Sequence, residues 1–267
     1  MSITLTPITP LVVGSPTGTS LADITLRVAR KVTDVMESVA TAGGAGTLTD
    51  TVRLNQVNGY WKNGTLWVLS GTYIGNVYPI AGYNVNILTI TGPTFTVGVR
   101  YAAARSLFDF YTLRQYVNNV LQELLVEKVD STLTGDGTTK TFTLPTGVSK
   151  VEAVDFTDSS GNQSISNHWQ LRGGAIVFRQ APGSAYTINL THLATPTELV
   201  ASSNTVDPSI NLDWLMWATV AQLLEWALVN YQNDPTLKID ERLNQANQQL
   251  AAKRPFSKPR VTVITAG

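Results

Sequence analysis

The residues with the greatest chemical reactivity in this 267-residue sequence are few and far apart. Cysteine is absent, and the only histidines are His168 and His192. Thiol catalysis, zinc fingers and histidine-rich metal sites are therefore excluded. Neither histidine has a nearby Ser/Asp pattern that would indicate a nucleophilic triad. We interpret both as isolated residues on strand or loop surfaces.

Two groups of carboxylates are candidates for acid–base chemistry or cation binding. Glu123 and Glu127 are four residues apart and would share one face of a helix, but Lys128 beside them indicates surface charges. Residues 155–162 carry oxygen-bearing side chains around Gly161, yet their spacing does not match an EF-hand, and a polar turn accounts for them better. No glycine-rich phosphate-binding motif occurs. The sequence therefore predicts a protein without enzymatic activity, cofactor or metal.

Basic residues gather near the C-terminus, where no acidic residue follows Glu241. Pro255 and Pro259 are incompatible with a helix there, and the β-branched run that follows favours an extended strand. The segment is either a solvated terminus or an arm that adds a strand to a partner's sheet. The residues predicted to bind the partner are Lys253, Arg254, Lys258, Arg260, Val261, Val263 and Ile264.

The most apolar segment spans residues 212–229. It is nearly long enough to cross a bilayer, but Asp213, Gln222 and Glu225 would be costly in lipid. We expect no membrane insertion and interpret the segment as the central helix of a bundle. A helix that is apolar on three sides needs neighbours on three sides, so we expect oligomerisation. The predicted subunit-interface residues are Trp214, Trp217 and Trp226.

Four segments have helical periodicity. Ser20 and Asp23 form a capping box for the first, and Asp207 and Asp234, each followed by proline, begin the last two. The predicted helices cover about residues 20–41, 112–128, 208–231 and 235–254.

Between these helices lie threonine-rich strand patterns separated by turns. Asn63–Gly64 is the strongest hairpin signal, and glycine-containing turns at 135–137 and 172–174 indicate further hairpins. The predicted fold class is α+β: a small α-helical bundle of four main helices with two inserted antiparallel β modules, barrel-like or sandwich-like. The predicted divisions are an extended N-terminal arm (1–19), the helical bundle (20–42, 108–130 and 207–254), a first β module (43–107), a second β module (131–206) and an extended basic C-terminal arm (255–267).

The charge balance restricts the function classes. The chain has 19 basic and 19 acidic side chains and a formal net charge of zero. A protein that binds free nucleic acid by neutralising phosphates normally carries a basic excess. The charged fraction of 14% is low, which suits a surface that is buried in an assembly.

The first β module resembles one that recurs in structural proteins of tailed bacteriophages. The resemblance is carried by TLTDT at residues 47–51, by YWKNGTLWVLSGT at residues 60–72, and by the later Gly75, Pro79 and Ile80. Residues 142–145 and 169–178 resemble a second β module of such virion proteins. The pattern departs at Val77 and Tyr78, where the family has a basic residue. The order of helices and modules is similar to that of head–tail connector (adaptor) proteins.

This resemblance implies a non-enzymatic structural subunit of a phage neck, located in the virion at the head–tail junction. Such subunits form rings, usually dodecameric, that join the portal to the tail and line the DNA channel. The implied partners are other copies of the chain, the portal protein, and a tail or neck (tail-completion) protein. DNA would pass through the channel transiently, and no membrane is involved. The C-terminal arm would contact the portal.

The alternative is a tail-tip or fibre-associated virion protein whose aromatic β module binds a receptor or carbohydrate. Trp61, Trp67, Tyr73 and Tyr78 would then form a platform for stacking on sugars. The C-terminal helical hairpin argues against this alternative. A virion cell-wall hydrolase would need paired carboxylates in a cleft, and the sequence offers no such constellation.

Overall fold

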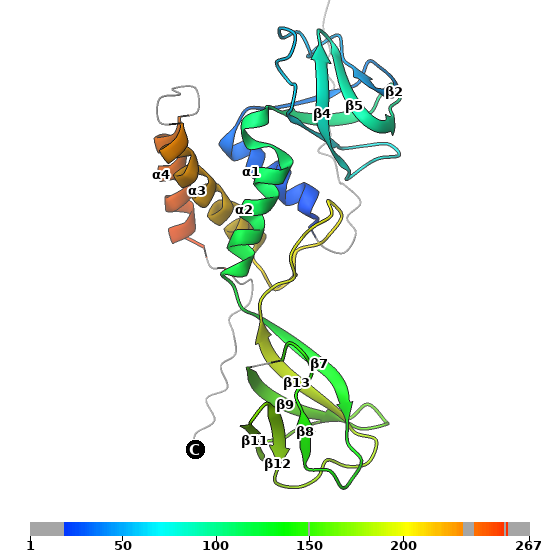
Figure 1. Ribbon diagram of the computed structural model, residues 1–267, viewed down its shortest axis with the longest axis vertical. Coiled ribbons are helices and arrows are strands. Elements are labelled where there is room, and N and C mark those ends of the chain that lie inside the picture. Colours follow the sequence, from blue (N-terminus) through cyan, green and yellow to red (C-terminus); the bar gives the residue numbers. More distant parts are fainter. Residues whose placement is uncertain (1–18, 149, 232–237, 254, 256–267) are drawn as a thin grey trace, which may run out of the picture. The chain divides into compact units, whose positions relative to one another are not determined.

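The computed structural model describes residues 19–148, 150–231, 238–253 and 255 (Figure 1). The chain divides into two compact units. The first combines the residues up to Val120 with those from Glu198 onward, and the second is Leu121–Thr197. Within the described residues, thirteen strands form three antiparallel sheets, accompanied by four α-helices and one 3₁₀ turn, η1 (Ser106–Phe108). The protein is therefore mostly β.

The predicted fold class, a helical bundle with inserted β modules, is wrong. Two predicted helices are shorter than expected, and the residues beyond them form strands. Helix α1 (Leu21–Val32) gives way to β1 (Val35–Val39), and α2 (Phe110–Gln122) gives way to β7 (Val126–Thr134). In both cases a distant strand supplies the hydrogen-bond partners, and this tertiary pairing overrides the helical spacing of the apolar residues.

A six-stranded sheet curls into a half-barrel in the first unit (Figure 1). Its strand order is β1-β6-β3-β4-β5-β2, so the two ends of the sheet are formed by strands that are neighbours in sequence. The remaining bounds are β2 Ala42–Thr49, β3 Thr65–Val68, β4 Val77–Asn84, β5 Ile87–Thr94 and β6 Arg100–Ala104. The largest side chains in its core are Trp61, Tyr83, Phe95 and Tyr101.

The hairpin predicted at Asn63–Gly64 is not formed between two strands, because residues 51–63 make turns and loop. Asn63 adopts a left-handed conformation with φ of 63°, as the turn signal indicated. Gly64 has a different role. A Cβ atom there would collide with the carbonyl oxygen of Ala104 on β6. Glycine therefore allows the chain to enter β3 directly against its neighbouring strand.

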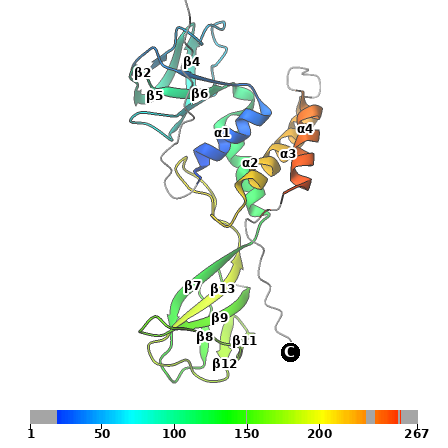
Figure 2. The same ribbon diagram turned by 180° about the vertical axis from the view of Figure 1, so that it is seen from behind.

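The four helices form a layer beside the half-barrel, as Figures 1 and 2 show from opposite sides. Helices α3 (Leu212–Asn230) and α4 (Ile239–Ala251) pack on each other and on α1. Hydrogen bonds between the layer and the half-barrel include those from Trp67 Nε1 to Thr25 Oγ1 at 3.3 Å and from the Phe110 amide to Thr65 Oγ1 at 2.8 Å. Arg30 Nε on α1 also donates to Glu37 Oε1 on β1 at 2.7 Å.

Two of the predicted helix caps lie among the described residues, and one of them is confirmed. The capping box of Ser20 and Asp23 is confirmed at the start of α1. The cap of α3 is Asn211, whose side chain accepts from the amides of the second and third helical residues, so the prediction that Asp207 caps this helix is wrong. Asp207 instead binds Ser209 in the preceding turn. Asp234 lies outside the described residues.

The second unit contains two sheets. The four-stranded sheet has the order β10-β9-β13-β7 and the three-stranded sheet the order β11-β12-β8. The bounds are β8 Thr141–Thr143, β9 Val151–Thr157, β10 Gln163–Ile165, β11 Trp169–Arg172, β12 Ala175–Phe178 and β13 Thr187–Ala194. Their shared core consists of Val148, Val154, Ile176, Phe178, Ile188 and Leu190.

One of the two hairpins predicted in this unit is confirmed. Strands β11 and β12 pair around the turn at 172–174. The segments on either side of the turn at 135–137 do not pair with each other, because β7 pairs with β13 and β8 pairs with β12. Asp136 still organises this turn, since its carboxylate accepts from the amides of Thr138 and Thr139.

Candidate functional site

The two histidines differ in environment. His192 is buried on β13, where its Nδ1 lies 3.3 Å from the Leu190 carbonyl oxygen, so the expectation that it lies on a surface is wrong. His168 is exposed in the loop before β11, as expected. Among the described residues, no group of three or more histidine or carboxylate side chains is arranged to hold a metal ion.

The carboxylate candidates do not form an acid–base pair on one helix. Glu123 follows the end of α2 and Glu127 lies on β7, so the prediction that they share a helix face is wrong. The polar turn predicted around Gly161 is confirmed. Asp158 accepts hydrogen bonds from the Asn162 side chain and from the amides of Asn162 and Ser160, and these bonds, led by that side chain, lower the pKa of Asp158.

The basic C-terminal arm is described only at its start. Lys253 Nζ lies 3.3 Å from Asp213 Oδ2 in the first turn of α3, and the Pro255 carbonyl accepts from the Asn211 amide at 2.7 Å. These two contacts attach the root of the arm to the N-terminus of α3. The other predicted arm residues, Arg254, Lys258, Arg260, Val261, Val263 and Ile264, lie outside the described residues.

The three tryptophans predicted at a subunit interface are largely covered by their own chain. Trp217 is buried, and Lys31 Nζ lies 5.1 Å from its ring centre. Trp214 is half-buried. Trp226 is half-buried between the rings of Tyr116, at 6.1 Å, and Tyr231, at 5.6 Å.

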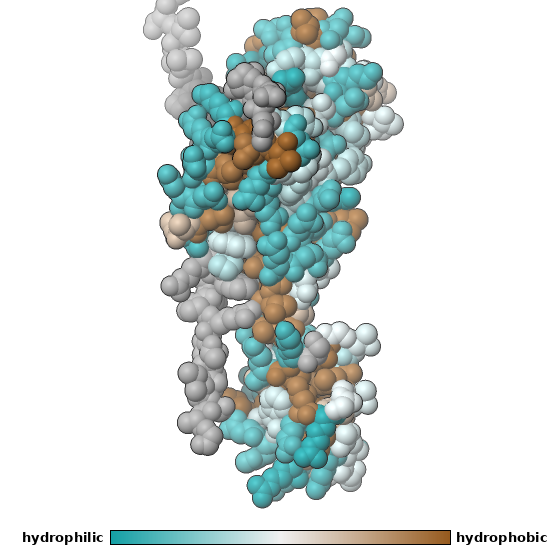
Figure 3. Space-filling view, turned by 60° about the vertical axis from the view of Figure 1, so that its left-hand side comes forward, coloured by the Kyte–Doolittle hydropathy of each residue, from teal (hydrophilic) through white to brown (hydrophobic). Residues whose placement is uncertain are grey.

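The exposed apolar surface of α3 lies instead at the C-terminal end of the helix. Val229 is 76% exposed and Tyr231, directly after the helix, is 38% exposed. The view toward α3 and α4 in Figure 3 shows hydrophobic side chains gathered among polar ones in the upper part of the molecule. None of the described helices is both long and apolar enough to span a bilayer.

The aromatic residues of the half-barrel do not form the predicted sugar-stacking platform. Trp61 and Trp67 are only 4% and 1% exposed, and the indole nitrogens bind Gln56 and Thr25. Tyr73 and Tyr78 are half-buried and pack edge-on against Phe95. These side chains are components of the core, so the prediction based on their exposure is wrong.

The TLTDT segment that carries the resemblance contains a completely buried carboxylate, Asp50. Tyr101 Oη on β6 donates to Asp50 Oδ2 at 2.7 Å, and the amides of Val52 and Arg53 donate to Asp50 Oδ1 at 2.8 and 3.0 Å. The Ser38 hydroxyl on β1 also binds this carboxylate. The network therefore joins two strands of the half-barrel to the loop that follows β2.

Hydrogen bonding determines the ionisation of this network. Burial alone would raise the pKa of Asp50, but the bonds from Ser38, Tyr101 and the two amides outweigh it and hold the pKa below its usual 3.8. Burial, together with the bond to Asp50, raises the pKa of Tyr101. Asp50 is therefore a carboxylate at neutral pH and Tyr101 is its permanent donor. No local pattern in the sequence indicates this long-range pair, because its two residues are 51 positions apart.

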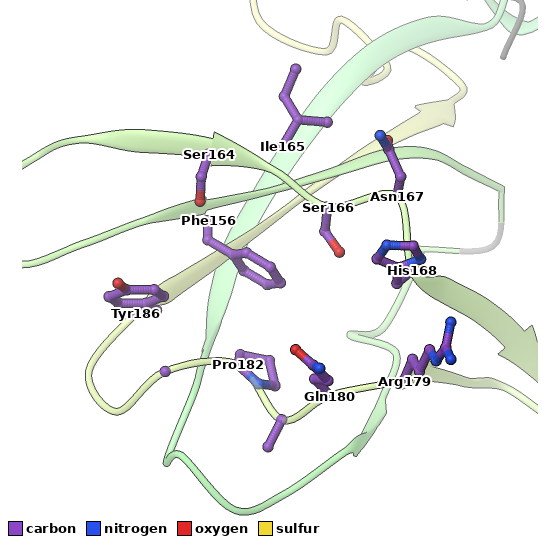
Figure 4. Close-up of a pocket in the computed structure, with 12 residues that line it drawn as sticks. Phe156, Ser164, Ile165, Ser166, Asn167, His168, Arg179, Gln180, Pro182 and Tyr186 are labelled. Carbon is purple, nitrogen blue, oxygen red and sulfur yellow. The ribbon is translucent and has the colours of Figure 1, made fainter.

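A cleft of about 430 Å³ in the second unit is a candidate binding site (Figure 4). The loop after β10 forms one wall and the segment after β12 the other. The ring of Phe156 lies between them. Of the residues considered for chemistry from the sequence, only His168 lines this cleft. No local motif identifies the cleft, because its residues come from separate strands and loops.

Comparison of the chain with models of known protein families and with curated protein sequences finds no match. The resemblance to phage virion proteins therefore depends on the turn-and-strand motifs alone.

Replacing Asp50 tests the buried network. For Asp50→Asn we expect the free energy of unfolding at pH 7 to fall by about 2 kcal/mol, because the charged acceptor of several bonds is lost. Since the folded-state pKa lies below 3.8, the stabilisation is present above this pH and disappears as the pH falls through the folded-state pKa. Urea unfolding at pH 7 and pH 3 measures the free energy of unfolding of wild type and variant. The difference between the two free energies should be smaller at pH 3.

The exposed Asp240 on α4 supplies the control: Asp240→Asn should change the free energy of unfolding little at either pH. A loss for Asp50→Asn that is equal at both pH values would contradict the proposed ionisation of Asp50.

Proposed function

We propose that the chain is a non-enzymatic structural subunit of a phage neck, one copy in a ring that joins the portal to the tail at the head–tail junction and lines the DNA channel. The motifs at residues 47–51 and 60–72 support the virion assignment. A formal net charge of zero is compatible with a channel wall that must let DNA slide past without holding it.

The observation that carries the ring proposal is the composition of α3. This nineteen-residue helix is apolar on most of its circumference, yet Val229 and the following Tyr231 at its C-terminal end remain exposed. Exposed apolar residues next to a half-buried aromatic cluster are typical of surfaces that bind another protein. We assign this end of α3 to the contact between neighbouring subunits, in place of the more buried Trp214 and Trp217.

The C-terminal arm is proposed as the portal contact. The root of the arm is attached to α3 through Lys253 and Pro255, so the basic and β-branched residues beyond it start from a defined position. A segment of this composition is suited to pairing with the edge of a partner's sheet.

Labelling of virions tests the location. Antibodies against the purified chain, detected with gold in electron micrographs of intact and partly disrupted virions, should label the head–tail junction. The same antibodies preincubated with the purified chain serve as the control and should give no label. Gold at the distal end of the tail would favour the tail-tip alternative, and no gold in either preparation would contradict a virion protein.

A charge at the exposed end of α3 tests the subunit contact. For Val229→Asp we expect assembly with the portal protein to be lost, because a carboxylate would be buried without a partner. Val57 is a matched control, since it is 74% exposed in the half-barrel, and Val57→Asp should assemble like wild type. Sedimentation of each chain mixed with portal protein measures assembly. Equal assembly of the two variants would show that this surface is not the interface.

Removal of the arm tests the portal contact. Deletion of residues 256–267 retains Lys253 and Pro255 and should leave the melting temperature unchanged, because the bonds at the root of the arm remain. Affinity for the portal protein should fall by about tenfold or more. Deletion of residues 1–18, which contain no basic side chain, is the control. Unchanged affinity after the C-terminal deletion would refute an arm contact.

A further inference from the structure

The cleft of the second unit combines three features that single out one class of ligand. The first is a set of polar side chains without partners. Ser166, Asn167 and Gln180 line the cleft, and within the described residues their side chains make no hydrogen bond to the protein. Figure 4 shows Ser166 on one wall and Gln180 on the other, with open space between them. Neutral donors and acceptors on two facing walls suit a ligand that carries many hydroxyl groups.

The second feature is charge. None of the residues that line the cleft is acidic, whereas Arg179 and His168 lie together at one end of it. The amide of Arg179 donates to the carbonyl of His168 at 3.0 Å, which holds the two walls together at this point. The guanidinium of Arg179 makes no ion pair within the described part of the chain and remains exposed. A planar guanidinium with all its donors available favours a carboxylate.

The third feature is an aromatic surface at the opposite end. The rings of Phe156 and Tyr186 lie 6.4 Å apart, tilted by 35°, and both are half-buried. Gly183 passes so close to Tyr186 that a Cβ atom would lie 3.0 Å from the ring, so the backbone holds this ring in place. An aromatic ring that is covered on one side offers its other side to the C–H face of a sugar.

We propose that this cleft binds an acidic oligosaccharide, with the carboxylate of one sugar on Arg179 and a neighbouring sugar on the aromatic surface of Phe156 and Tyr186. A bare anion would use only the arginine end, and a neutral sugar would leave the arginine without a partner. A nucleic acid would need more positive charge than one arginine supplies. The proposal does not depend on the proposed ring of subunits in a phage neck, because it concerns residues of the second unit alone.

The test begins with the fluorescently labelled full-length chain on an array of uronic-acid, sialic-acid and neutral oligosaccharides. The chain should bind at least one acidic oligosaccharide more tightly than its neutral counterpart. Isothermal titration with that oligosaccharide then compares the variants. Arg179→Gln should weaken binding about tenfold or more, because a charge-assisted contact is lost. Tyr186→Ala should also weaken binding, whereas Tyr186→Phe, which keeps the ring, should not.

Arg172→Gln is the matched control, since Arg172 is an exposed arginine of the same unit that binds Gln170 on β11 and does not line the cleft. It should leave the affinity unchanged. The proposal is overturned if no acidic oligosaccharide binds, if Arg172→Gln and Arg179→Gln weaken binding equally, or if inorganic phosphate or sulfate binds the cleft as tightly as the oligosaccharide does.

Discussion

The half-barrel depends on one buried carboxylate. Asp50 has no exposure to solvent, and an ionised carboxylate in that position is tolerated only if its oxygens are fully hydrogen-bonded. Tyr101 and Ser38 come from β6 and β1, and the two amides come from the loop after β2. The same interaction therefore fixes the path of a loop and two adjacent strands, in a sheet whose open side lacks the closure of a complete barrel.

The helical layer is positioned relative to this sheet by a second polar contact, from Trp67 on β3 to Thr25 on α1. Both residues are buried, so the hydrogen bond has no competition from water and its geometry is restrictive. Around it, α1 presents a buried apolar face that α3 covers. The helices thus form a second packed layer with a buried apolar core of its own.

Local signals in the sequence predict some local features of the structure and fail at others, such as the hairpin at Asn63–Gly64 and the cap at Asp207. The capping box of Ser20 and the hairpin at 172–174 involve residues that are neighbours in sequence, and both are present. Residues 35–39 and 126–128 form strands and not the predicted helices, because apolar residues at helical spacing also fit a strand. The outcome depends on a partner strand far away in the sequence. The cleft was missed for a related reason: its walls come from segments that only the fold brings together. Trp61 and Trp67 were expected to stack on sugars, but both are buried and belong to the core.

The root of the C-terminal arm has a mechanical consequence. Because Lys253 and Pro255 are bound at the first turn of α3, the residues that follow α4 are attached to the start of α3 as well as to the end of α4. A partner that pulled on the chain beyond Pro255 would load these two contacts before it loaded α4. The force would be transmitted first to the N-terminus of α3, the most apolar of the described helices.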